Sequence, residues 1–130
     1  MPITVEWANS ERTVLLYRVV EQWTWDDFHM ANQTSRDLLA SVDHPADMIC
    51  DFSGSQGIPP RVLSNIGKEL RQKRAPNLRQ IVLVGVSGLM RNLADVLRTL
   101  YPKETSDIID AHTMDHAFRL LSATGKTTLK

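Results

Sequence analysis

The chain has 130 residues, 42% of them hydrophobic and 23% charged, and its formal net charge is zero. This length suits one domain with its own core, and no apolar run approaches the roughly 18 residues of a membrane-spanning helix. The start, MPITVEW, lacks the basic and apolar segments of a secretion signal, so we expect a soluble, cytoplasmic protein. The single cysteine, Cys50, excludes an intramolecular disulfide, and its apolar neighbours predict a buried thiol.

The zero net charge combines two segments of opposite sign. Residues 1–60 contain three Lys or Arg and nine Asp or Glu, whereas residues 61–103 contain nine basic and two acidic residues. Such asymmetry can attract an acidic partner or a second copy of the chain, which makes a homodimer one hypothesis. A solvated helical face is the more ordinary interpretation, and we do not expect nucleic acid as a partner.

The N-terminal third predicts a hairpin and then a helix. Apolar and polar residues alternate over 3–7, and the β-branched run 13–20 follows after a short turn, which favours two antiparallel strands. Thr24 can then cap a helix, and the carboxylate of Asp27 can complete a capping box. Apolar residues at helical spacing continue this helix to about Val42.

Three strand–helix units complete the chain. The predicted strands cover residues 46–52, 79–88 and 108–109. The run 46–52 is short and continuously apolar, as expected of a central strand covered on both faces, and the run 79–88 is the clearest buried strand in the sequence. Pro60 fits the first turn of the helix after 46–52, where its missing N–H is harmless, and Leu63 belongs to that helix's apolar face.

The element order is therefore β-β-α-β-α-β-α-β-α. Alternating strands and helices predict an α/β fold: a mixed, mostly parallel sheet of about five strands, with an N-terminal antiparallel hairpin and four helices. We expect one domain over residues 1–124, followed by a polar, disordered tail at 125–130.

Ligands and chemistry collect at the carboxyl ends of parallel strands, which places two loops at one rim of the sheet. These loops are residues 51–60 and the segment GVSG at 85–88. A G-x-S-x-G nucleophile elbow would need glycine at position 89, where Leu89 stands, so this pattern fails. Ser87 is better explained as the N-cap of the next helix.

Two further groups of residues could form a catalytic or a metal site. Ser53 or Ser55 with Asp51 and a histidine would make a hydrolytic triad, but the spacing selects no histidine. His112 and His116 have a spacing found in some metal sites, yet a metal needs three or four converging ligands. We therefore predict no metal and no cofactor.

The phrase DFSGSQGIPPRVLSNIGKELR, together with the element order, resembles the STAS domains, and more closely the SpoIIAA-like and STAS/SEC14-like proteins. The resemblance implies a non-enzymatic regulator that binds a kinase-like anti-sigma factor and is switched off by phosphorylation near the helix after the central strand. Asp51, Phe52 and Ser53 match the first half of the family's motif. Residues 56–60 depart from its second half, which leaves Ser53 and Ser55 as candidate acceptors.

The leading hypothesis is thus an interaction module that binds a protein partner through the loop 53–60 and the following basic helix. The candidate partner-binding residues are Asp51, Ser53, Ser55, Gln56, Ile58, Arg61, Ser64 and Lys68. The alternative is a carrier or sensor of a small apolar ligand, because SEC14-like relatives enclose apolar molecules. This alternative predicts a cavity between helices and sheet. A serine-type hydrolase is the third hypothesis.

Overall fold

The computed structural model describes residues 2–86 and 88–123. The predicted tail at 125–130 and the predicted cap Ser87 lie outside the described residues. The strands are β1 Ile3–Trp7, β2 Val14–Glu21, β3 Ala46–Ser55, β4 Leu78–Val84 and β5 Ile108–Ala111. The helices are α1 Trp25–Ala40, α2 Val62–Leu70, α3 Gly88–Leu100 and α4 Met114–Ala123.

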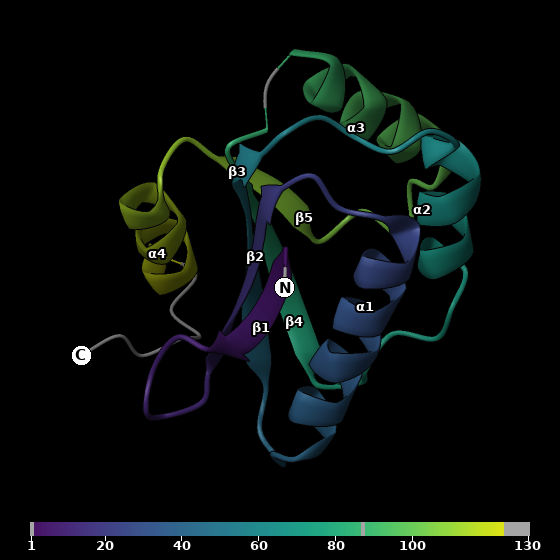
Figure 1. Ribbon diagram of the computed structural model, residues 1–130. Helices are drawn as coiled ribbons and strands as arrows, with labels where there is room; N and C mark the ends of the chain where they lie inside the picture. Colours follow the sequence, from purple (N-terminus) through teal and green to yellow (C-terminus); the bar gives the residue numbers. More distant parts are fainter. Residues whose placement is uncertain (1, 87, 124–130) are drawn as a thin grey trace.

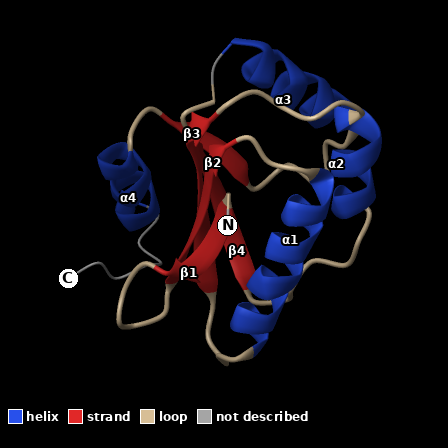
Figure 2. Ribbon diagram, in the orientation of Figure 1, coloured by secondary structure: helices blue, strands red, loops and turns tan. Residues whose placement is uncertain are grey.

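The strands form one mixed sheet in the order β1-β2-β3-β4-β5. β1 pairs with β2 antiparallel, and every later pair is parallel, which confirms the predicted fold class. Helices α1, α2 and α3 cover one face and α4 covers the other (Figure 1). Figure 2 shows the strands as a single layer between the helices. None of the helices in the described part is both long and apolar enough to cross a bilayer.

The start of α1 follows the predicted capping chemistry. The hydroxyl of Thr24 accepts a hydrogen bond from the amide of Asp27 at 3.1 Å, and the Asp27 carboxylate accepts one from the Thr24 amide at 2.9 Å. The ring of Trp23, just before the cap, lies 6.1 Å from that of Phe28. These contacts confirm the capping box and fix the angle at which α1 leaves β2.

Several boundaries differ from the prediction, and the strand predicted over 79–88 already ends at Val84. β3 extends to Ser55, three residues beyond the predicted end, because β2 continues far enough to pair with Gly54 and Ser55. α2 begins at Val62 and not at Pro60, because Arg61 between them has a left-handed φ of 67° that interrupts helical geometry. Leu63 is 43% exposed, so its assignment to the apolar face of this helix was wrong.

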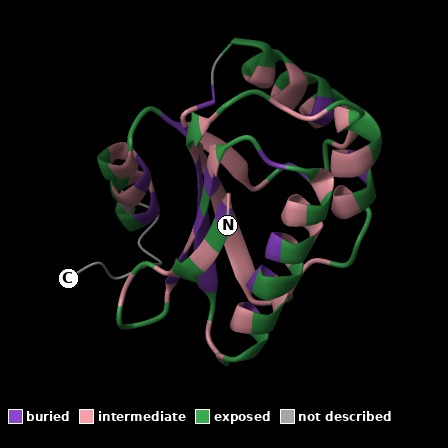
Figure 3. Ribbon diagram, viewed as in Figure 1, coloured by how far each residue is buried: buried purple, intermediate pink, exposed green. Residues whose placement is uncertain are grey.

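The core has one cluster on each face of the sheet (Figure 3). Leu15, Tyr17 and Met48 pack toward α1, whereas Ile49 and Val82 pack toward α4. β3, in the middle of the sheet, is buried from Ala46 to Asp51, as predicted for a central strand. β4, predicted as the clearest buried strand, is buried only at Val82 and Val84 and half-buried elsewhere, so that prediction was wrong.

Candidate functional site

A cavity of about 860 Å³ lies between the sheet and helices α1, α2 and α3. The sheet contributes a wall of Tyr17, Met48, Cys50, Ile81, Leu83 and Ile108. The facing helices contribute Phe28, Leu39, Ile66, Met90, Leu93 and Leu97. Because these side chains are almost all apolar, the cavity suits a ligand with a large apolar body.

The cavity explains why β4 is less buried than its sequence predicts. Val82 and Val84 face α4 and are buried, but Ile81 and Leu83 on the opposite face are only half-buried. α2 and α3 pack against each other more than against the sheet, so they roof the cavity without filling it. An apolar strand indicates that both faces are covered, but it does not say whether a side chain or a ligand covers them.

Aromatic side chains close the end of the cavity near the carboxyl ends of β2 and β3. Trp25 lies edge-on to Trp23, with ring centroids 5.1 Å apart, and edge-on to Phe28, 5.4 Å apart. The indole N–H of Trp25 donates to the carbonyl oxygen of Pro60 at 2.5 Å, which ties the loop before α2 to this cluster. Ile58 in that loop is half-buried and lines the cavity.

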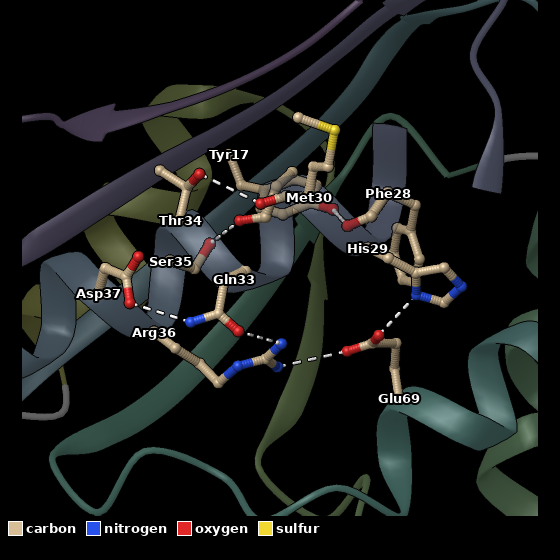
Figure 4. A network of polar contacts seen from close by, with 11 residues as sticks. Tyr17, Phe28, His29, Met30, Gln33, Thr34, Ser35, Arg36, Asp37 and Glu69 are labelled. Atoms are coloured by element: carbon tan, nitrogen blue, oxygen red, sulfur yellow. Dashed lines mark hydrogen bonds and ion pairs between the residues drawn. The ribbon is translucent and has the colours of Figure 1, made fainter. Parts of the chain in front are cut away.

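A polar bridge of His29, Arg36, Asn65 and Glu69 joins α1 to α2. Figure 4 shows how Glu69 of α2 faces His29 and Arg36 of α1. The two carboxylate oxygens of Glu69 contact His29 Nδ1 at 2.6 Å and Arg36 Nη1 at 3.4 Å. His29 Nε2 lies 3.3 Å from Asn65 Oδ1. Only 10% of the Glu69 side chain is exposed, so these contacts lie partly out of water. Polar side chains therefore hold α2 over the cavity.

Burial keeps the two ionisable groups of the sheet wall neutral. Desolvation raises the pKa of the Cys50 thiol to about 12. The pKa of Tyr17 is also raised, chiefly by desolvation and then by its electrostatic interactions with Cys50 and Glu69. The Tyr17 hydroxyl donates to the carbonyl oxygen of Phe28 at 3.5 Å. The wall consequently carries no charge near neutral pH, which suits binding of an apolar molecule.

The predicted rim forms where the carboxyl ends of β3 and β4 meet. A Cβ added at Gly85, whose φ is 79°, would lie 2.5 Å from the amide nitrogen of Ser53, so only glycine fits this close approach. Asp51 is buried, and its Oδ1 accepts from the amide of Ser53 at 3.0 Å and from its hydroxyl at 2.5 Å. Ser55 Oγ accepts from the Trp23 indole and donates to the Gly57 carbonyl oxygen. Both serine hydroxyls therefore take part in building this loop.

The predicted partner-binding residues do not all face the same way. Gln56, Arg61, Ser64 and Lys68 are exposed, as is Ser53, while Ser55 and Ile58 are half-buried and Asp51 is buried. Ile58 faces the cavity, and Asp51 supports the loop from below. The exposed members follow the end of the loop and one face of α2. This is the open surface that a protein partner would reach.

The histidines occupy separate environments. His29 belongs to the polar bridge, and His44 Nδ1 contacts the carbonyl oxygen of Pro45. His112 and His116 stack on each other with ring centroids 5.4 Å apart. Within the described ranges no histidine is hydrogen-bonded to a rim serine, and no three potential His, Cys, Asp or Glu ligands converge for a metal ion. In the described residues, neither the triad nor the histidine metal site comes together.

Sequence reasoning missed the polar bridge and the composition of the cavity wall. Glu69 is one acid in a basic segment, and His29 is a single histidine inside an amphipathic helix. Their partnership joins residues 40 positions apart, for which a single sequence carries no signal.

A scan against models of known protein families found no match to this chain, and a search of the curated proteins found none either. The resemblance to the STAS and SEC14-like proteins stays a prediction from the sequence.

Proposed function

We propose that this protein is a carrier or sensor that holds a small apolar molecule in the cavity between its sheet and helices α1, α2 and α3. The observation that carries the proposal is the cavity itself, at about 860 Å³ with mostly apolar walls. Ligand sites typically measure about 300–1,000 Å³ and are lined mostly by apolar side chains, as this cavity is. An apolar space of this size is best explained by an occupant.

The chemistry of the walls favours binding over reaction. The Cys50 thiol is neutral because its pKa is raised to about 12, which deprives it of nucleophilic character. The rim serines bond to Asp51, the Trp23 indole and a backbone carbonyl, and within the described part of the chain neither of them bonds to a histidine, the base of a hydrolytic triad. The SEC14-like resemblance agrees with this proposal, since those relatives enclose apolar molecules.

Uptake of Nile red, a neutral apolar dye that fluoresces strongly out of water, tests the proposal. We expect saturable binding of one dye per chain. Leu83→Trp should weaken this binding about tenfold or more, because the larger ring occupies the cavity from the sheet wall. Leu89→Trp is the matched control, since Leu89 lies on α3 but is 69% exposed. No saturable uptake by the unchanged protein, or equal uptake by the Leu83→Trp variant, would overturn the proposal.

A second candidate function is the interaction module, and the exposed face of α2 favours it. Arg61, Ser64 and Lys68 face solvent beside Leu63, an apolar residue that is 43% exposed. Mixed basic and apolar surfaces of this kind suit an acidic protein partner, such as a kinase-like regulator. Replacing Arg61 and Lys68 by glutamate should weaken capture of a partner from host extract, and unchanged capture would count against this surface.

A further inference from the structure

The charged residues that line the cavity are mostly basic. Six are Lys or Arg and two are Glu. Arg36, Arg74 and Arg98 are neutralised by ion pairs with Glu69, Asp107 and Asp110. In the described part of the chain, no ion pair is formed by the other three, Arg71, Lys73 and Lys103. These three, which we call the basic mouth, leave positive charge available at the cavity.

The basic mouth gathers at one end of the cavity, at the amino ends of β4 and β5. Two connections meet there: residues 71–77 after α2 and residues 101–107 after α3. Arg71 donates to the Tyr101 hydroxyl at 2.9 Å, and Arg74 donates to the carbonyl oxygen of Glu104 at 3.0 Å. Lys73 directly precedes Arg74, and Lys103 directly precedes Glu104. Both lysines are exposed and line the cavity, so at this end of the cavity positively charged side chains lie next to its apolar wall.

The opposite end of the cavity has a different character. Trp25, Phe28 and Phe52 line it near the carboxyl ends of the strands, and Val86 and Met90 complete its apolar wall. The cavity thus changes along its length from an aromatic, uncharged end to a basic mouth open to water. A molecule that matches both ends has an apolar body and one anionic group.

We propose that the ligand is a single-chain amphiphile whose carboxylate or phosphate head group binds at Arg71, Lys73 and Lys103, with its alkyl chain extending toward Trp25 and Phe52. This inference rests on the proposed function. The cavity's volume of about 860 Å³ lies in the range of roughly 300–1,000 Å³ that is typical of sites for one small molecule, which favours a single alkyl chain over a bulkier two-chain phospholipid.

Displacement of Nile red by palmitate, below its critical micelle concentration, tests the head-group assignment. Palmitate should displace the dye at about tenfold lower concentration than methyl palmitate, which has the same chain without the charge. The double variant Lys73→Met and Lys103→Met should show a clearly weaker preference, because only Arg71 of the basic mouth remains, and should still bind Nile red. Lys68→Met, a change on α2 at a lysine outside the cavity lining, should keep the preference.

Further competition measurements identify the anionic head group and distinguish failure of the head-group assignment from failure of the carrier proposal. Hexadecyl phosphate that outcompetes palmitate would assign a phosphate head group, and the reverse order would assign a carboxylate. Displacement of the dye by inorganic phosphate alone would overturn the amphiphile. Equal displacement by palmitate and methyl palmitate, or a preference that is undiminished in the double variant, would overturn the basic mouth and leave the carrier proposal standing. Failure of the unchanged protein to bind Nile red would overturn both proposals.

Discussion

Filling the cavity should stabilise the ligand-free protein, and Ala94→Leu is the substitution that tests this most clearly. Ala94 lies on α3, is half-buried and lines the cavity. Leucine adds three carbon atoms, worth about 0.8 kcal/mol each when buried, or roughly 2 kcal/mol in total. Partial burial and the slightly better helix propensity of alanine reduce this, so we expect a gain of about 1 kcal/mol in the free energy of unfolding.

The same substitution at Ala117 is the matched control. Ala117 lies on α4, is 0% exposed and packs in the cluster on the opposite face of the sheet. There the added carbons meet a filled core, and overpacking costs about 1–3 kcal/mol. Urea denaturation of the delipidated proteins measures both changes. If Ala94→Leu destabilises the protein as Ala117→Leu does, the space between α3 and the sheet is already filled and the reasoning fails.

Three other residues, Glu69, Cys50 and Arg79, lead to predictions about ligand dissociation, pH dependence and stability. Glu69→Gln removes the charge at the centre of the polar bridge, so the rate at which Nile red dissociates, measured by stopped-flow dilution, should rise several-fold. Asp37→Asn, on the exposed face of α1, should leave this dissociation rate unchanged. Burial raises the pKa of Cys50 from 9.0 to about 12, so the free energy of unfolding should be at its full value below pH 9 and should fall as the pH rises toward 12. Iodoacetamide should accordingly label this thiol only when urea unfolds the protein. Arg79→Met should cost about 3–5 kcal/mol in urea denaturation, because it deprives the buried carboxylate of Asp47 of a bidentate partner; a loss below about 1 kcal/mol would show that this pair is not needed.

The fold was largely predictable from local patterns. Thr24 and Asp27 form the predicted capping box, and the alternation over residues 3–7 became the edge strand of an antiparallel hairpin. Local rules failed where backbone geometry depends on a neighbour. Pro60 satisfies the rule for a helix start, but the left-handed φ of Arg61 delays the helix, and β3 is lengthened by its pairing with β2.

The site was less predictable because it is a space that the helices and the sheet leave unfilled between them. The sequence pointed to the rim around Asp51 and Ser53, which the structure does bring beside Gly85. The cavity lies below that rim, and residues such as Leu83 that line it are the apolar residues any core would contain. Hydrophobic periodicity tells which face turns inward, but the distance between two apolar faces depends on the tertiary arrangement. The cavity was therefore predictable only through the SEC14-like resemblance, as the second of three hypotheses.

Native mass spectrometry of the protein purified from its own host tests the central claim most directly. We predict a species heavier than the 14.7 kDa chain by the mass of one small amphiphile, which disappears on denaturation and is recovered by solvent extraction. Fragmentation of the extracted molecule would then show one alkyl chain and an anionic head group. A bare chain mass, both as purified and after incubation with palmitate, would contradict the claim that this cavity holds a ligand.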